Sequence, residues 1–153
     1  MAIVLRPARL EDAKALHESC YPEADLEDVA FFLAWSLRQV ERGRMVRLVA
    51  EVDGQVVGTA QLTMWGSEGE IGSVVVAESH RRQGLARRLI AALTAEARAR
   101  KLAALEIGVR RDQPHIQAFY ESLGFRPAIK KGELHPPFSE PIVFLKMPLS
   151  APQ

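Results

Sequence analysis

Hydrophobic and polar positions follow a strand-like pattern at the start of the chain and a helical period in the segments after it. Residues 3–5 form a short apolar run that stops before Pro7, which predicts a strand. In residues 11–20 and 25–41, apolar side chains recur three or four positions apart, which predicts two helices. The first helix ends at Tyr21, because a residue before a proline is pushed out of helical geometry.

The middle of the chain changes from a β pattern to a helical one. Residues 47–52 and 55–64 flank Asp53-Gly54, a dipeptide typical of two-residue hairpin turns. The continuous valines within residues 70–76 predict an inner strand that is covered on both faces. From residue 85 to about residue 100, apolar side chains recur every four positions, which predicts a helix.

The last part of the chain predicts three more strands and one helix. We expect a strand at residues 104–109, a helix at 114–123, and a strand pair at 125–130 and 142–147. The resulting order is β-α-α-β-β-β-α-β-α-β-β. This order predicts an α/β (α+β) fold, with a mixed, mostly antiparallel central sheet of about seven strands flanked by about four helices.

Composition narrows the class of protein. The 153 residues fit one domain, which we expect over residues 1–149, followed by a short tail at 150–153. The net charge of +1 gives no bulk attraction to nucleic acid, and Cys20, the only cysteine, excludes an internal disulfide. No apolar run is long enough to cross a bilayer, and the first residues carry no secretion signal. We therefore expect a cytoplasmic protein that binds neither nucleic acid nor a membrane.

Residues 74–87 carry the strongest functional pattern, because a strand runs into a basic turn that opens a helix. The first turn of a helix has backbone N–H groups without partners and a partial positive charge. Gly84 removes a side chain where a phosphate would approach these groups, and the neighbouring arginines add charge. Neither a dinucleotide-binding fingerprint nor a Walker A loop is present. The segment predicts a pyrophosphate site of another kind, with a solvated basic helix face as the alternative.

Two motifs resemble the GCN5-related N-acetyltransferase (GNAT) superfamily. Residues 81–86, Arg-Arg-Gln-Gly-Leu-Ala, fit its Arg/Gln-x-x-Gly-x-Gly/Ala loop, which binds the pyrophosphate of acyl-CoA. Residues 118–125, Ala-Phe-Tyr-Glu-Ser-Leu-Gly-Phe, are similar to its second signature, where a helix ends and a strand begins. The resemblance implies a GNAT fold and transfer of an acetyl group from acetyl-CoA to a primary amine of a small molecule or peptide, without a metal. It is also compatible with a homodimer, which is common in the family.

The resemblance further implies roles for individual residues. The pantetheine arm of acetyl-CoA would pair with the strand segment at residues 74–76, and the backbone after it would bind the pyrophosphate. Tyr120 would be the general acid that protonates the departing CoA thiolate, and Gln113 would bind a pantetheine amide where the family often has asparagine. The implied cofactor-binding residues are Val74, Val75, Val76, Arg81, Arg82, Gln83, Gly84, Leu85, Ala86, Arg87, Gln113 and Tyr120.

The sequence offers several candidates for the general base and for the acceptor site. Glu70 is the best candidate for a catalytic base, and strand alternation places Gly72, Val74 and Val76 on its face; an ordinary surface role is the alternative. Glu51 and Glu106 also lie on predicted strands. A set of aromatic residues could line an acceptor pocket or pack in the core, and residues 130–141 could add to specificity. The aromatic set is Tyr21, Phe31, Phe32, Trp35 and Trp65.

The sequence is also compatible with two functions that are not enzymatic. A non-catalytic acyl-CoA-binding sensor or subunit would need the phosphate loop but not the acid at Tyr120. An interaction domain that binds RNA through the basic segment ranks last, because aromatic residues are not interleaved with its charges. Nothing in the sequence names the acceptor amine.

Overall fold

The computed structural model describes residues 2–128 and 142–149, and in this part of the chain the predicted order of elements is confirmed. Two short 3₁₀ turns, η1 and η2, are added to it. The elements are β1 (Ile3–Pro7), η1 (Leu10–Asp12), α1 (Ala13–Cys20), α2 (Leu26–Glu41), β2 (Met45–Val52), β3 (Gln55–Trp65), β4 (Glu68–Val76), η2 (Glu78–His80), α3 (Leu85–Ala99), β5 (Ala104–Arg110), α4 (Pro114–Ser122), β6 (Arg126–Ala128) and β7 (Ile142–Pro148).

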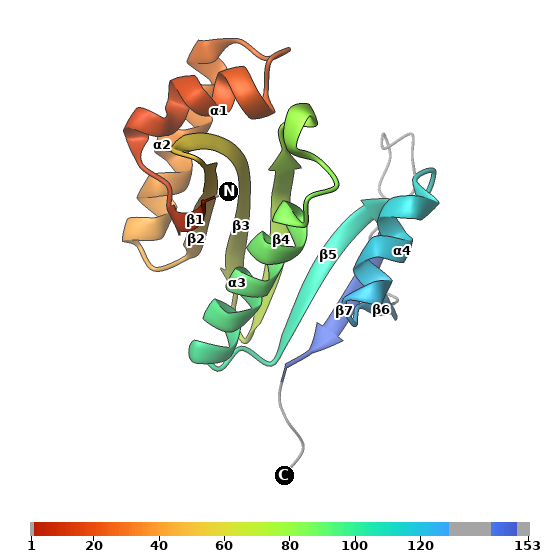
Figure 1. Cartoon of the computed structure of the whole chain (residues 1–153). Helices are drawn as coiled ribbons and strands as arrows, with labels where there is room; N and C mark the ends of the chain where they lie inside the picture. Colours follow the sequence, from red (N-terminus) through yellow and green to blue (C-terminus); the bar gives the residue numbers. More distant parts are fainter. Residues whose placement is uncertain (1, 129–141, 150–153) are drawn as a thin grey trace.

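The strands form one seven-stranded sheet in the order β1-β2-β3-β4-β5-β7-β6 (Figure 1). Every neighbouring pair is antiparallel except β4 and β5, which are parallel. The Asp53-Gly54 turn joins β2 to β3 with positive φ at both residues, as its sequence predicts. The predicted mixed, mostly antiparallel sheet with four helices is therefore confirmed.

Helices cover both faces of the sheet, and alternation along β2 decides which residues meet which helices. Leu48 and Ala50 join the core that α3 and α4 complete, whereas Val49 joins the smaller core under α1 and α2. The face of the sheet under α3 and α4 is the α3 face, and the opposite face, under α1 and α2, is the α1–α2 face (Figure 1).

The pairing of β4 with β5 covers only the first residues of each strand. Glu68–Glu70 pair with Ala104–Glu106, and beyond this point the two strands separate (Figure 1). The prediction of an inner strand covered on both faces is therefore wrong for the second half of β4, where Val74 and Val75 are half-buried. A continuous valine run does not distinguish a covered strand from one that has lost its neighbour.

A bulge interrupts β4 at Ser73, which has a φ of 50°. Gly72 pairs with Gln61 and Val75 pairs with Thr59, so two residues of β4 oppose one residue of β3. The extra residue reverses the alternation: Glu70 shares a face with Gly72 and Val75. The predicted placement of Glu70 on one face with Val74 and Val76 is therefore wrong.

Candidate active site

The turn before α3 has the geometry that the sequence predicts for an anion site. Gly84 precedes the helix with a φ of +81°, and a Cβ built on it would meet nothing within 4 Å. The Arg88 N–H donates to the Gly84 carbonyl (3.0 Å), so the amides of Leu85, Ala86 and Arg87 precede the hydrogen-bonded ladder of the helix. Backbone donors at the positive end of a helix thus face open space.

A cavity of about 820 Å³ lies beside this turn and extends between the end of β4 and α4; it is called the donor cavity below. Most of the predicted cofactor-binding residues line it. Gln83 and Gln113 are not among the lining residues, and their binding roles stay predictions. The lining residues are Val74, Val75, Val76, His80, Arg81, Arg82, Gly84, Leu85, Ala86, Arg87, His115, Ile116, Phe119 and Tyr120.

Two of the arginines in this region have partners within the protein. The Arg81 Nε donates to the Val76 carbonyl (3.1 Å), which ties the turn to the end of β4. The Arg87 guanidinium lies over the Phe119 ring, 5.8 Å from its centroid. Within the described residues, no hydrogen-bond partner is found for the amides of Leu85, Ala86 and Arg87, and the arginines add positive charge around them.

Tyr120 lines the donor cavity from α4 and is only 5% exposed. Its ring makes edge contacts with Phe119 and Phe125, and no hydrogen bond of its hydroxyl is found within the described residues. Burial raises the pKa of Tyr120 to about 12. The phenol is therefore protonated at neutral pH, as a proton donor has to be.

Glu70, the predicted base, lines a different cavity from Tyr120. The Trp65 Nε1 donates to its Oε1 (3.2 Å), and both residues border a cavity of about 520 Å³ at the start of β4, which Glu106 and Lys146 also line. The structure does not bring Glu70 and Tyr120 to one cavity. A base at Glu70 therefore remains a prediction.

The α1–α2 face holds a third cavity, of about 350 Å³, which the sequence did not predict as a site; it is called the Arg47 cavity below. The signal in the sequence was Arg47 itself, a charge with apolar residues on both sides in a mostly apolar strand. The cavity's walls are otherwise mostly apolar. Its lining residues are Leu16, Tyr21, Ala24, Asp28, Val29, Phe32, Leu33, Arg47 and Ser73.

The aromatic candidates divide between cavities and surface. Tyr21 and Phe32 line the Arg47 cavity, whereas Trp65 borders the cavity of Glu70. Phe31 is 71% exposed and Trp65 is 65% exposed, so core packing is wrong for these two. Residues 130–141, the other candidates for acceptor specificity, lie outside the described part of the chain.

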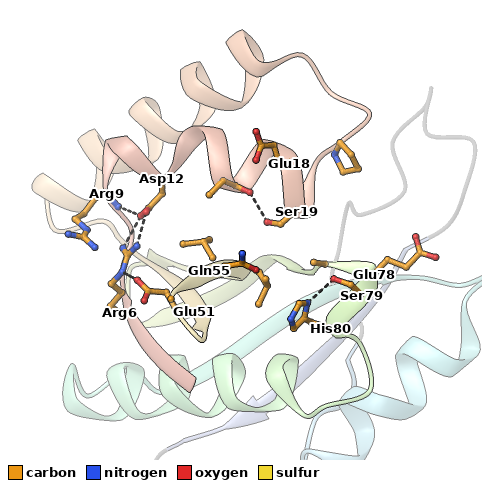
Figure 2. A pocket seen from close by; sticks show the side chains of 16 residues that line it. Arg6, Arg9, Asp12, Glu18, Ser19, Glu51, Gln55, Glu78, Ser79 and His80 are labelled. Atoms are coloured by element: carbon orange, nitrogen blue, oxygen red, sulfur yellow. Dashed lines mark hydrogen bonds and ion pairs between the residues drawn. The ribbon is translucent and has the colours of Figure 1, made fainter. Parts of the chain in front are cut away.

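A fourth cavity, of about 830 Å³, lies between α1 and the β2–β3 turn and contains a closed ion-pair cluster (Figure 2). Arg6 donates to both carboxylate oxygens of Asp12 (2.7 and 2.9 Å) and to Glu51. Asp12 also accepts from the Arg9 amide (2.7 Å). Each charge in this cluster has an opposite partner, which fits a structural role for Glu51 rather than that of a base.

Two further findings concern the described residues. Residues 2–128 and 142–149 contain no group of three or more His, Cys, Asp or Glu side chains that could hold a metal ion. None of the helices in this range is both long and apolar enough to span a membrane.

Comparisons with known proteins agree with the fold. The sequence model described as the Acetyltransferase (GNAT) family matches residues 10–125. A ribosomal-protein-alanine N-acetyltransferase from Brucella melitensis is 28% identical, with a TM-score of 0.78 over 95% of this chain and 99% of that one.

Two other similar structures contain the cofactor. PaiA N-acetyltransferase from Thermoplasma acidophilum, in complex with coenzyme A, has a TM-score of 0.78 at 14% identity, over 97% of this chain and 99% of that one. YncA from Salmonella typhimurium, a putative acetyltransferase with its cofactor acetyl-CoA, has a TM-score of 0.76 at 23% identity, over 98% and 95%. At these identities the likeness establishes the fold.

Proposed function

Because the chain belongs to the Acetyltransferase (GNAT) family, we propose that it transfers an acetyl group from acetyl-CoA to a primary amine of a small molecule or peptide. The observation that carries this proposal is the donor cavity itself. Main-chain amides at the Gly84 turn line one part of it, and the protonated phenol of Tyr120 lines another. A diphosphate and a thioester are the groups that these two features would bind.

In the proposed complex, acetyl-CoA lies along the donor cavity. The amides of residues 83–87 bind the pyrophosphate, and the positive end of α3 stabilises its charge. The pantetheine arm takes the place of a strand beside Val74 and Val76, where β5 has separated from β4. In this proposal the thioester sulfur lies near Tyr120.

The proposed reaction is a direct attack. The neutral amine adds to the thioester carbonyl, a tetrahedral intermediate forms, and the C–S bond then breaks to release the amide product and the CoA thiolate. Tyr120 donates its proton to the thiolate, a contribution worth roughly 10²–10⁴-fold in rate. The proton that leaves the amine passes to a carboxylate, for which Glu70 acting through water is the candidate.

One observation favours a second candidate, a non-catalytic acyl-CoA-binding sensor or subunit. Among the described residues, no carboxylate lines the donor cavity, so an amine bound there has no adjacent carboxylate base. The test is incubation with acetyl-CoA and a panel of primary amines, with release of free CoA thiol as the readout and calorimetry for CoA binding. Thiol release that depends on an amine supports the enzyme, whereas tight CoA binding without turnover on any amine supports the sensor.

A further inference from the structure

The Arg47 cavity and the donor cavity meet at β4. Val74 lines the donor cavity, and the residue before it, Ser73, lines the Arg47 cavity from the α1–α2 face. The bulge at Ser73 lies in the part of β4 that β5 no longer covers. A molecule in the Arg47 cavity would therefore contact a residue of β4 that is next to one lining the donor cavity.

Arg47 is the buried charge of this cavity, with only 3% of its surface exposed. Its Nε donates to the Thr59 hydroxyl (3.1 Å), and its Nη1 donates to the Ser36 hydroxyl (3.3 Å) and the Gln61 Oε1 (3.0 Å). The Phe32 ring lies 5.7 Å from the guanidinium carbon. All of these partners are neutral, so they orient the guanidinium without balancing its charge.

Among the described residues Arg47 forms no ion pair, although the exposed Asp28 also lines the cavity. Burial lowers the pKa of Arg47, and the only nearby groups that oppose this effect are the Tyr21 hydroxyl and the Cys20 thiol. Arg6 is the opposite case, because hydrogen bonds from its side chain to Asp12 and Glu51 raise its pKa. A buried cation without an opposite charge is costly, so an anion that entered the cavity would gain a strong, charge-assisted partner.

The remaining walls of the cavity define the rest of the ligand. Leu16, Val29, Phe32 and Leu33 make most of them apolar, with Asp28 as the acidic exception. A volume of about 350 Å³ is near the lower end of the roughly 300–1,000 Å³ typical of small-ligand sites. We propose that the Arg47 cavity binds the acceptor substrate, and that this acceptor is an amine that also carries a carboxylate and an apolar side chain, as an apolar amino acid does. This inference depends on the proposed function and narrows its substrate class.

The first test compares acids with their amides in the wild-type protein. Thiol release from acetyl-CoA is measured with L-leucine, L-methionine and L-phenylalanine and with the corresponding amino acid amides. The acid can form a buried, charge-assisted hydrogen bond with the Arg47 guanidinium, and the amide cannot. The kcat/KM for each acid should therefore exceed that for its amide by about tenfold or more. Equal values for acids and amides, with turnover of other amines, would overturn this inference and leave the proposed function intact.

The second test asks whether Arg47 is the cause. In Arg47→Met the ratio of kcat/KM for acid over amide should fall to about one, and Arg47→Lys, which keeps the charge but not the forked donors, should retain part of the preference. Arg44→Met, which removes an exposed arginine just before β2, is the matched control and should keep the wild-type ratio. A preference that survives in Arg47→Met would show that Arg47 only supports the fold.

A binding measurement separates this inference from catalysis. The melting temperature of the CoA complex is recorded with N-acetyl-L-leucine and with N-acetyl-L-leucinamide. A larger rise for the acid, lost in Arg47→Met, supports an anion site even if no amine is acetylated, in which case only the proposed function fails. Equal shifts for both compounds in the wild type would exclude a carboxylate site at Arg47.

Discussion

The donor cavity and the Arg47 cavity meet at β4 and offer positive charge in different ways. In the donor cavity, the donors are main-chain amides at the start of α3, exposed because Gly84 has no side chain. In the Arg47 cavity, the charge is a single guanidinium held by neutral side chains from α2 and β3. The donors of the first site come from one turn of the chain, whereas the charge of the second is positioned by three separate elements.

This difference has an energetic consequence for the protein without ligands. Water can satisfy the exposed amides at the Gly84 turn when no diphosphate is bound. The Arg47 guanidinium is buried and keeps a dehydration cost that neutral partners offset only in part. We therefore expect changes at the Gly84 turn to act on ligand affinity, and changes around buried arginines to act on both affinity and stability.

The largest expected effect is on the donor side. Gly84→Glu places a carboxylate where the diphosphate should bind, so it should weaken CoA binding by more than about 100-fold, measured by calorimetry. Gly43→Glu is a matched control, because Gly43 also has a positive φ of 71° with nothing within 4 Å of a built Cβ. Both glycines have a positive φ, so the two variants should carry similar backbone strain, and only Gly84→Glu should lose CoA. Unchanged CoA affinity in Gly84→Glu would contradict the loop assignment.

The next effect distinguishes chemistry from binding. Tyr120→Phe removes the proposed proton donor, so kcat should fall by roughly 10²–10⁴-fold while the Kd for CoA changes little. Its stability should be preserved, because no partner of the hydroxyl is found within the described residues. Tyr21→Phe, on the Arg47 side, should instead act on the KM for carboxylate-bearing acceptors. Full turnover in Tyr120→Phe would remove the acid role.

The smallest expected effect concerns Arg6, whose ion pair with Asp12 makes it the arginine to compare with Arg47. Burial alone would raise the pKa of Asp12, but hydrogen bonds from Arg6 and the Arg9 amide outweigh it and lower the pKa. A depressed pKa means that this stabilisation is complete above the unfolded value of about 3.9 and is lost as the pH falls through the lower, folded value. Asp12→Asn should therefore lower the free energy of unfolding at pH 7 by about 2 kcal/mol.

The control for this prediction is Asp112→Asn, which removes the exposed partner of Arg110, where the two side chains are 53% and 49% exposed. It should change stability little. Urea unfolding between pH 7 and pH 2.5 should show a shallower loss of stability for Asp12→Asn than for the wild type. Parallel curves for the two proteins would mean that the Arg6–Asp12 pair contributes nothing to acid stability.

Much of the fold and of the donor site could be predicted from the sequence, because the signals are local. The four-residue apolar period of α3, the Asp53-Gly54 turn and the Gly84 turn each depend on residues within a few positions. The position of Tyr120 followed from a motif whose helix and strand are adjacent in the chain. Glu70 illustrates the limit, because one extra residue at Ser73 reversed the alternation that had placed it beside Val74.

The sequence by itself determined the order of the elements, the loop that presents its amides at Gly84, and the membership of a family that transfers acetyl groups. The tertiary structure alone decided where β4 leaves β5, and that Arg47 meets Ser36, Thr59 and Gln61 rather than a carboxylate. The physical reason is the range of the interactions involved. A turn or a helix start is governed by neighbouring backbone dihedrals, but the charge balance of a buried side chain depends on residues that only folding brings into contact.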